Sequence, residues 1–313
     1  MTAEARRTIP RERALTEWLA RLFPRDAARV PIGIGDDAAV VLSRSRTLVL
    51  KCDPVVEGVH FEADTPRSSV GRKVVMRNAS DLAAMGASPD FLLVSVVFRR
   101  GTRSADERRL FRGLRDAARQ IGAQVVGGDV AVSAGPLVVT VTMVGHLEGP
   151  ALRRDRARIG DTVHVTGPLG GSILGRHLRI RPRLVEGRWL ASQDAVRAGM
   201  DVSDGLAVDL WTLLRASGVP GAELDEAAIP LHRDARRLAA ARGSSAIDHA
   251  LGDGEDHELL FTLRRGGRLG RGGPLTALAR RPIGRLVARR GLWLRRRDGT
   301  LHPLSPRGWQ HRT

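Results

Sequence analysis

The apolar positions of the N-terminal half of the chain follow helical and strand-like periods in turn. Residues 11–23 predict a helix, because Leu15, Trp18 and Leu22 fall on one stripe and Pro24 ends it. Two more helices are predicted by the same spacing, at Ser69–Met85 and Ala105–Ile121. Short apolar or Val/Thr-rich runs predict strands at Thr47–Leu50, Phe91–Phe98, Gln124–Val126 and Leu137–Leu147.

The C-terminal half begins after a basic, irregular stretch, Glu148–Gly160, which is the best candidate for a domain boundary. Beyond it we predict a helix near Leu206–Ala216, stopped by Gly218. Strands are predicted at Thr162–Thr166, Glu258–Leu263 and Gly284–Leu294. Because helices and strands mix without a regular βαβ order, the pattern predicts an α+β protein with antiparallel or mixed sheets. We expect two domains, residues 1–150 and 151–313.

Composition narrows the class of protein. The chain is 42% hydrophobic and 27% charged, which is enough apolar surface for a true core. Its one cysteine, Cys52, excludes an internal disulfide framework and most thiolate metal sites. The N-terminus lacks the apolar stretch of a secretory signal, and no apolar run reaches the length of a membrane span. We therefore expect a cytoplasmic protein with no membrane contact.

The formal net charge of +17 raises the question of nucleic-acid binding. Lys51 and Lys73 are the only lysines of the chain. All other residues counted as Lys or Arg are arginines, and they are spread along the whole sequence. Surfaces that follow a phosphate backbone usually cluster their cations and interleave aromatic residues. We therefore expect no nucleic acid as the main ligand and favour small anionic molecules.

Six short segments place aspartates beside glycine or serine. They are GIGDDAAVV (33–41), KCDPVVEGVHF (51–61), NASDLAAMGA (78–87), VVGGDV (125–130), DVSDGLAVDL (201–210) and GDGEDHELLF (252–261). Clustered carboxylates are costly unless they are paired or bind metal, and adjacent glycines let phosphate oxygens approach the backbone. Oxygen ligands without cysteine or paired histidines indicate Mg²⁺ together with substrate phosphates.

Each segment also has an ordinary structural interpretation when taken alone. An Asp–Gly or Ser–Asp pair is commonly a turn or a helix N-cap. His60 can be a core histidine, and Trp309 can cap the core near the C-terminus. The GIGDDA run is not a dinucleotide fingerprint, because no strand precedes it, and the chain has no Gly-x-x-x-x-Gly-Lys-Ser/Thr loop.

Taken together and in this order, the six segments resemble those of the thiamine-monophosphate kinase family, within the aminoimidazole-ribonucleotide-synthetase-like superfamily. NASDLAAMGA, VSDGLAVDL and GEDHELLF carry most of the resemblance, which extends from the first helix to the C-terminal GWQH. The resemblance implies a homodimer whose N-terminal domains pair into a shared β-barrel, with ATP in the adjoining cleft. It also implies a C-terminal α/β sandwich-like domain.

The implied reaction moves the γ-phosphoryl group of ATP directly onto thiamine phosphate, with several Mg²⁺ ions. Metal-ligand roles are implied for Asp37, Asp53, Asp81, Asp129, Asp201 and Asp204. Nucleotide-binding roles fall on Gly128, Asp129, Arg154 and Ser203, and substrate-binding roles on His60, Glu255 and Trp309. Catalysis would rest on Asp129, Arg154 and Asp204, since an arginine can donate in a fork to transferring phosphate oxygens.

The chain departs from the family pattern at several positions. Lys51-Cys52 precede Asp53 where Ser-Thr is usual, Asp253 precedes the glycine of the glutamate motif, and His257 replaces tyrosine. These departures leave two alternatives open. One is a divergent superfamily member that uses ATP on another substrate, and the other is a non-catalytic nucleotide-binding paralogue.

Overall fold

The computed structural model describes residues 11–35 and 38–309. The chain divides into two compact units, which are described separately below. The N-terminal unit contains the residues up to Val75 and the segment Pro89–His146. The C-terminal unit contains Met76–Ser88 and the residues from Leu147 onwards. The second half of one helix therefore belongs with the C-terminal unit.

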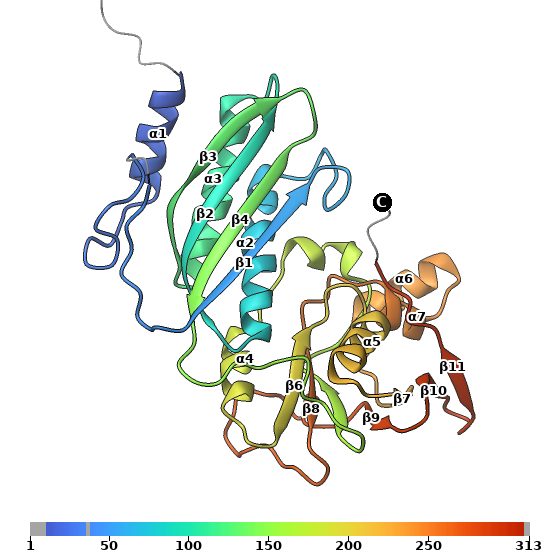
Figure 1. Ribbon diagram of the computed structural model, residues 1–313. Coiled ribbons are helices and arrows are strands. Elements are labelled where there is room, and N and C mark those ends of the chain that lie inside the picture. The colour runs from blue at the N-terminus through green and yellow to red at the C-terminus, as the bar shows by residue number, and fades with distance from the viewer. Residues whose placement is uncertain (1–10, 36–37, 310–313) are drawn as a thin grey trace, which may run out of the picture. The chain divides into compact units, whose positions relative to one another are not determined.

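The N-terminal unit is built on a four-stranded mixed sheet of order β1-β4-β2-β3 (Figure 1). Strand β1 runs antiparallel to β4, and β2 runs parallel to β3. The elements in chain order are α1 (Arg11–Leu22), β1 (Leu48–Val56), α2 (Arg67–Ala84), β2 (Ser88–Arg99), α3 (Ser104–Gln120), β3 (Gln124–Ser133) and β4 (Val138–His146). Because β1 and β3 are the edge strands, residues on them are separated by β4 and β2.

Helices cover one face of this sheet, while the other face is covered only in part, where Val30 packs against Phe91 and Val126. Helices α2 and α3 lie against one face, where side chains such as Val74, Leu110 and Leu114 are fully buried. Strand β1 shows the complementary pattern, since Leu50 remains 69% exposed. Leu93 on β2, which points to the same face, is 42% exposed. Exposed apolar side chains of this kind are unusual for a finished surface and indicate a face that associates with another surface.

The C-terminal unit is built on a seven-stranded sheet of order β11-β10-β7-β9-β5-β8-β6. Its pairings are antiparallel except for β10 with β7, so this sheet is also mixed. The strands are β5 (Thr162–Val165), β6 (Val196–Asp201), β7 (Gly221–Asp225), β8 (Leu259–Leu263), β9 (Gly284–Val287), β10 (Gly291–Arg295) and β11 (Leu301–Leu304). The helices are α4 (Leu184–Ala191), α5 (Leu206–Ser217), α6 (Arg233–Arg242) and α7 (Ala246–Gly252), with 3₁₀ turns at Ser172–Leu174 and Arg176–Leu178.

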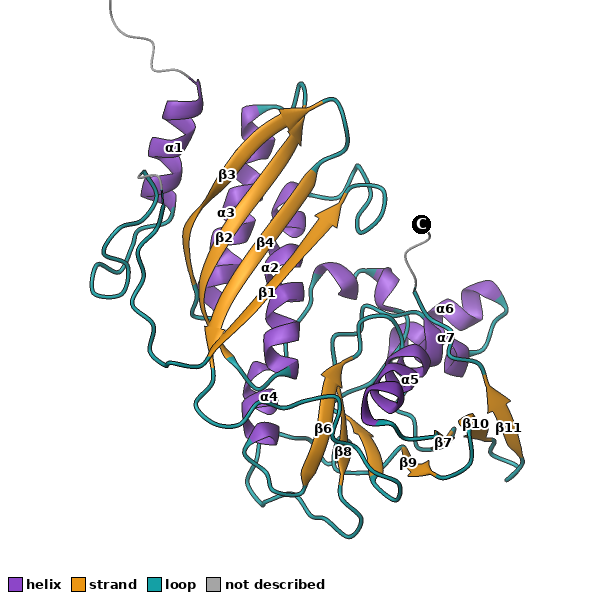
Figure 2. Ribbon diagram, in the orientation of Figure 1, coloured by secondary structure: helices purple, strands orange, loops and turns teal. Residues whose placement is uncertain are grey.

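Both faces of the β6–β8 end of this sheet are covered, with α5 on one side and α4 on the other (Figure 2). Alternation along β8 explains this, because Leu260 packs into a cluster with α5 and α7 while Leu259 and Phe261 pack into another with α4 and the end of α2. Two apolar clusters therefore lie on opposite faces of one sheet, as expected for an α/β layered unit.

The predicted helices and most predicted strands are present, and the sheets are mixed as expected. One prediction was wrong: Gly284–Leu294 is not a single strand but β9 and β10, separated by a bend at residues 288–290. Strand β3 also extends to Ser133, well beyond the predicted Gln124–Val126, because its glycines are accommodated by a bulge against β2. Among the described residues, no helix has the length and apolarity needed to span a bilayer.

Candidate functional site

The backbone of the loop after β6 is fixed by a single buried carboxylate, that of Asp209. The Oδ2 atom of Asp209 accepts hydrogen bonds from the backbone N–H groups of Ser203, Asp204 and Gly205, at 3.0, 3.1 and 3.1 Å. Burial, with repulsion from Asp201 and Asp204, raises the pKa of Asp209 to about 8. This network fixes the backbone that presents Asp201, Ser203 and Asp204 at the start of α5.

The glutamate motif runs directly alongside this loop. The backbone N–H of Glu255 donates to the carbonyl of Ser203 at 2.7 Å, and that of His257 donates to the carbonyl of Val202 at 2.8 Å. Both Glu255 and His257 have φ of +52°, a conformation that non-glycine residues seldom adopt. Strained backbone of this kind persists only where the surroundings enforce it, and it is often found at functional sites.

Asp201 lies at the centre of this corner of the C-terminal unit. It is only 5% exposed, and its Oδ2 atom accepts a 2.7 Å hydrogen bond from the hydroxyl of Ser80, on the second half of α2. The motif residue Asp81 directly follows Ser80 in that helix. The imidazole of His257 is buried beside Asp201, with Nδ1 3.5 Å from Oδ2, and neither ring nitrogen has a hydrogen-bond partner among the described residues.

The C-terminal segment reaches the same loop. The backbone N–H of Trp309 donates to the carbonyl of Asp204 at 2.9 Å, and the guanidinium of Arg307 pairs with Asp248 on α7. The Trp309 side chain remains 49% exposed. Segments distant in sequence thus meet at one corner, and they bring together Ser80, Asp201, Ser203, Asp204, Glu255 and Trp309.

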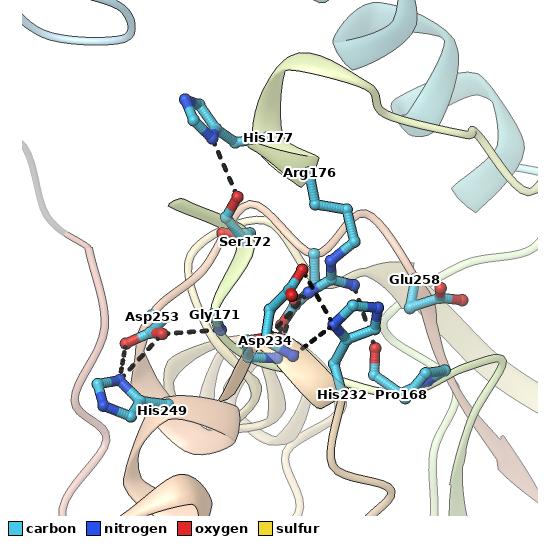
Figure 3. Close-up of polar contacts among 12 residues, drawn as sticks. Pro168, Gly171, Ser172, Arg176, His177, His232, Asp234, His249, Asp253 and Glu258 are labelled. Atoms are coloured by element: carbon cyan, nitrogen blue, oxygen red, sulfur yellow. Dashed lines mark hydrogen bonds and ion pairs between the residues drawn. The ribbon is translucent and has the colours of Figure 1, made fainter. Parts of the chain in front are cut away.

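A glycine turn after β5 is clamped by the two acidic residues that flank Glu255 (Figure 3). Asp256 accepts hydrogen bonds from the backbone N–H of Gly170 and from the guanidinium of Arg176, and Asp253 accepts from the N–H of Gly171. Burial raises the pKa of Asp256 to about 7, although the Arg176 charge acts in the opposite direction. Gly170 has φ of +89°, and a Cβ atom there would lie 2.6 Å from a backbone nitrogen of α7.

The unusual Asp253 therefore has a structural role. His249 of α7 contacts Asp253 through Nδ1, 2.9 Å from Oδ1, so Asp253 links α7 to the turn at Gly171. The neighbouring Glu258 accepts from Arg183 and from the hydroxyl of Thr166. Both acidic residues brace the loop that carries Glu255, which explains why this motif is so rich in carboxylates.

The N-terminal unit presents its motif residues on edge strands. On β1 the ammonium of Lys51 lies 3.1 Å from Asp53 Oδ1, and both side chains are partly exposed, as expected for residues two apart on one face of a strand. Asp129 lies on β3, where it is paired with Ser95. With two strands between them, Asp53 and Asp129 are three strand spacings apart, about 14 Å.

Gly128, next to Asp129, is required by packing. Its φ is +153°, and a Cβ atom there would lie 1.9 Å from the carbonyl oxygen of Val94 on β2. The glycine lets β3 follow β2 closely while Asp129 keeps its place on the strand.

His60 lies in the turn that follows β1 and is held from two sides. Its Nδ1 atom accepts the backbone N–H of Val56 at 3.1 Å, so a neutral ring carries its proton on Nε2. Its carbonyl accepts a 2.6 Å hydrogen bond from the ammonium of Lys73, a fully buried residue of α2. The turn therefore presents a fixed Nε2–H donor.

Comparison with known proteins identifies the family. The N-terminal domain model of AIR synthase related proteins matches residues 35–147. Thiamine-monophosphate kinase of Rhodopirellula baltica is 35% identical over 301 residues, which cover 92% of this chain and 93% of the relative. The same enzyme from Aquifex aeolicus is 32% identical over 298 residues, covering 89% and 92%. This chain belongs to the thiamine-monophosphate kinase family.

Solved structures agree with this family assignment. AaThiL complexed with AMPPCP and TMP superposes with a TM-score of 0.75 at 29% identity, covering 95% of this chain and 96% of that one. The thiamine-monophosphate kinase of Stenotrophomonas maltophilia gives 0.76 at 33% identity, covering 91% and 96%. The hydrogenase maturation protein HypE of E. coli gives 0.75 at 19% identity, with 95% and 98% covered, which shows a shared fold alone.

Not every residue assigned by resemblance to the family lies in the corner around Asp201. Asp37 falls outside the described residues. Arg154 has an exposed side chain, while its carbonyl accepts from the hydroxyl of Ser217. Within the described ranges, no three His, Cys, Asp or Glu side chains are gathered closely enough to hold a metal ion by themselves.

Three residues that shape the site were missed by sequence reasoning: Lys73, Asp209 and Ser80. Lys73 had a usable signal, because it is one of two lysines and lies on the apolar side of a predicted helix. Asp209 follows the Ser-Asp-Gly turn by four residues, a spacing that suits capping of the turn's N–H groups. Ser80 had no such signal, since its partner Asp201 is 121 residues away.

Proposed function

We propose that this protein transfers the γ-phosphoryl group of ATP to the phosphate of thiamine phosphate, which yields thiamine diphosphate and ADP. The family supports the reaction class, and the AMPPCP and TMP bound to AaThiL support the two substrates. One structural observation carries the proposal to this chain: Asp201, Ser203, Asp204, Glu255 and Trp309 are gathered by hydrogen bonds at one corner of the C-terminal unit.

The donor set of that corner fits Mg²⁺. Asp201 and Asp204 offer hard carboxylate oxygens, and Mg²⁺ prefers oxygen ligands that it shares with substrate phosphates. We propose that Asp201, Asp204 and Asp81, with Asp37, Asp53 and Asp129 of the N-terminal unit, hold several Mg²⁺ ions. Bound Mg²⁺ would supply positive charge to the phosphate oxygens during transfer.

The protein's own residues have to bind and orient two charged substrates. The acceptor is an ionised phosphate oxygen, so no strong general base is needed and in-line positioning dominates. The Nε2–H of His60 donates to the thiamine phosphate, Glu255 faces its cationic part, and the exposed Trp309 ring offers a stacking face. Gly128, Ser203 and Arg154 contact the nucleotide, with Arg154 donating to its phosphates.

The working form in this proposal is a homodimer in the cytoplasm, with the two N-terminal sheets forming a shared barrel. The exposed apolar residues Leu50 and Leu93 lie on the face opposite α2 and α3, where a second copy would cover them. The placement of Asp53 and Asp129 on opposite edges also suits a barrel, because β1 of one copy would then lie beside β3 of the other. A metal site that uses both aspartates would take one from each subunit.

The activity is tested by incubating the protein with ATP, Mg²⁺ and thiamine phosphate and by measuring thiamine diphosphate and ADP. We expect equal amounts of both products, and no thiamine diphosphate when thiamine replaces thiamine phosphate. ATP hydrolysis without thiamine diphosphate, or transfer to another acceptor only, would overturn the proposal.

The shared site is tested by mixing two inactive variants, Asp53→Asn and Asp129→Asn, after unfolding and refolding them together. In a mixed dimer with shared sites, one site loses both aspartates and the other keeps both. Random pairing should therefore restore about a quarter of the wild-type activity, since half of the dimers are mixed and each has one intact site. Sites contained within one chain would leave the mixture inactive.

A further inference from the structure

A cavity of about 400 Å³ opens on the C-terminal unit, and none of its lining residues belongs to the six motif segments. Its wall is formed by β5, by the turn that follows β8 and by the segment before β9. Three arginines line it: Arg264, Arg268 and Arg280. The lining contains no acidic side chain. Such a volume falls in the range of small-molecule sites.

The charged side chains of the surrounding sequence are all positive. Residues 259–297 contain 12 arginines and no aspartate, glutamate or lysine. Later arginines of this stretch are neutralised, since Arg285 pairs with Glu223 and Arg296 with Glu226. Across the described parts of the chain, no carboxylate lies within ion-pair distance of Arg264, Arg268 or Arg280, which leaves the cavity with uncompensated positive charge.

The cavity arginines are attached to well-fixed backbone. The N–H of Arg264 donates to the carbonyl of Ala195 at 2.9 Å, and its own carbonyl accepts from Gly267 at 2.7 Å, which closes the turn that carries Arg268. Arg280 lies over the ring of Trp189, 5.6 Å from its centroid, and donates one hydrogen bond to Gly270. Most of its N–H groups are thus left for a ligand.

The wall behind the arginines is neutral. His164 is 2% exposed and stacks on Phe261 with ring centroids 5.2 Å apart, and burial lowers its pKa to about 4. Its Nε2 atom lies 2.9 Å from the hydroxyl of Thr162, another lining residue. A low-dielectric wall behind several cations strengthens their attraction for an anion.

We propose that this cavity binds a small molecule through a diphosphate group. Three guanidinium groups match the charge and the several oxygens of a diphosphate, because each guanidinium can donate to two oxygens at once. A single phosphate would engage fewer of these donors and fill less of the volume. Since the lining has no carboxylate, binding here requires no metal ion, unlike phosphate binding through the aspartates.

The test measures binding of inorganic pyrophosphate by calorimetry in EDTA and 150 mM salt, so that metal-dependent sites do not contribute. The lining variant is Arg264→Gln with Arg268→Gln. The matched control is Arg265→Gln with Arg271→Gln, which removes the same charge from exposed positions of the same segment that do not line the cavity. Melting curves check that both variants fold.

We expect wild type and control to bind pyrophosphate with dissociation constants within about twofold of each other, and the lining variant to bind at least tenfold more weakly. Inorganic phosphate should bind wild type at least tenfold more weakly than pyrophosphate. An equal loss in both double variants would mean general attraction to a basic surface and would overturn the proposal. So would the absence of pyrophosphate binding to wild type, or phosphate binding as tight as that of pyrophosphate.

Discussion

The two units of the chain hold their acidic motif residues in opposite ways. In the N-terminal unit, Asp53 and Asp129 lie on the edge strands of a sheet, and strand register alone sets their positions. In the C-terminal unit, Asp201 and Asp204 lie on a loop fixed by Asp209 and by the neighbouring glutamate motif. One set is presented on an open surface, while the other is built into a hydrogen-bonded interior.

Burial is what separates the two arrangements. The Asp201 side chain is 7% exposed and lies near the buried carboxylate of Asp209, whereas the Asp53 side chain keeps 24% of its surface exposed and contacts Lys51. Neighbouring buried carboxylates repel one another and are expensive to desolvate, so Asp201, Asp204 and Asp209 create unfavourable electrostatics that bound cations would relieve. In the N-terminal unit, Asp53 instead lies beside a cation, the ammonium of Lys51.

The largest expected effect is a loss of kcat when Asp201 or Asp53, one aspartate from each unit, is replaced by asparagine. Asp201→Asn and Asp53→Asn should each lower kcat by about 10³-fold, because each removes a charge that helps hold Mg²⁺ and phosphate. Only Asp201→Asn should raise the melting temperature without Mg²⁺, since it removes repulsion with Asp204 and Asp209. Near-normal kcat for Asp201→Asn would contradict the site, and equal melting shifts in both variants would contradict the contrast.

The second prediction concerns acid stability, which should be set by the C-terminal unit. The pKa of His164 is lowered to about 4 by burial, against 6.5 when exposed, so the unfolded state binds the proton first as pH falls. This group's contribution is complete above pH 6.5 and is lost towards pH 4, a change of about 3 kcal/mol in unfolding free energy. The raised pKa values of Asp209 and Asp256 act in the opposite direction over this range, so the contribution of His164 is read as a difference. Urea unfolding at pH 7, 6 and 5 should show that wild type loses more unfolding free energy on acidification than His164→Phe does.

The exposed His302 provides the control for that measurement, because His302→Gln should leave the pH slope unchanged. If His164→Phe keeps the wild-type slope, another group governs acid stability.

The third prediction concerns His60, which lies in a turn of the N-terminal unit and is held there by Lys73. Lys73→Met removes the hydrogen bond to the His60 carbonyl and should raise the KM for thiamine phosphate about tenfold, with little change in the KM for ATP. The control is Arg72→Met on the same helix, which removes a hydrogen bond to Gln120 and leaves the one to His60 in place. Equal KM values for wild type and Lys73→Met would show that the turn holds its shape unaided.

The smallest expected effect concerns Lys51. Its ammonium pairs with Asp53 on a partly exposed strand, where such a pair stabilises by less than about 1 kcal/mol. Lys51→Ser should therefore change saturated turnover by no more than about threefold, while it lowers the Mg²⁺ concentration needed for half-maximal rate because Asp53 is released. Turnover measured against Mg²⁺ concentration checks this, and a loss above tenfold would mean that Lys51 itself contacts the phosphates.

The sequence by itself determined the elements whose pattern is local. The helices α1, α2, α3 and α5 follow from apolar spacing and stop signals, and the six aspartate segments led to the family and its reaction. Local patterns could not predict β6 or β7, because strands of six and five residues are too short for a period to separate them from loops. For the same reason β9 and β10 were merged into one strand.

The tertiary structure alone decided which side chains meet. Ser80 contacts Asp201 across 121 residues, the carboxylates beside Glu255 accept hydrogen bonds from the loop at Gly170 and Gly171, and sheet order places Asp53 and Asp129 on opposite edges. A motif records that an aspartate is needed at one point of the chain. The residues that contact this aspartate, and the burial that sets its pKa, depend on segments that are distant in sequence and meet only in the folded protein. A local sequence pattern cannot predict which distant segments meet.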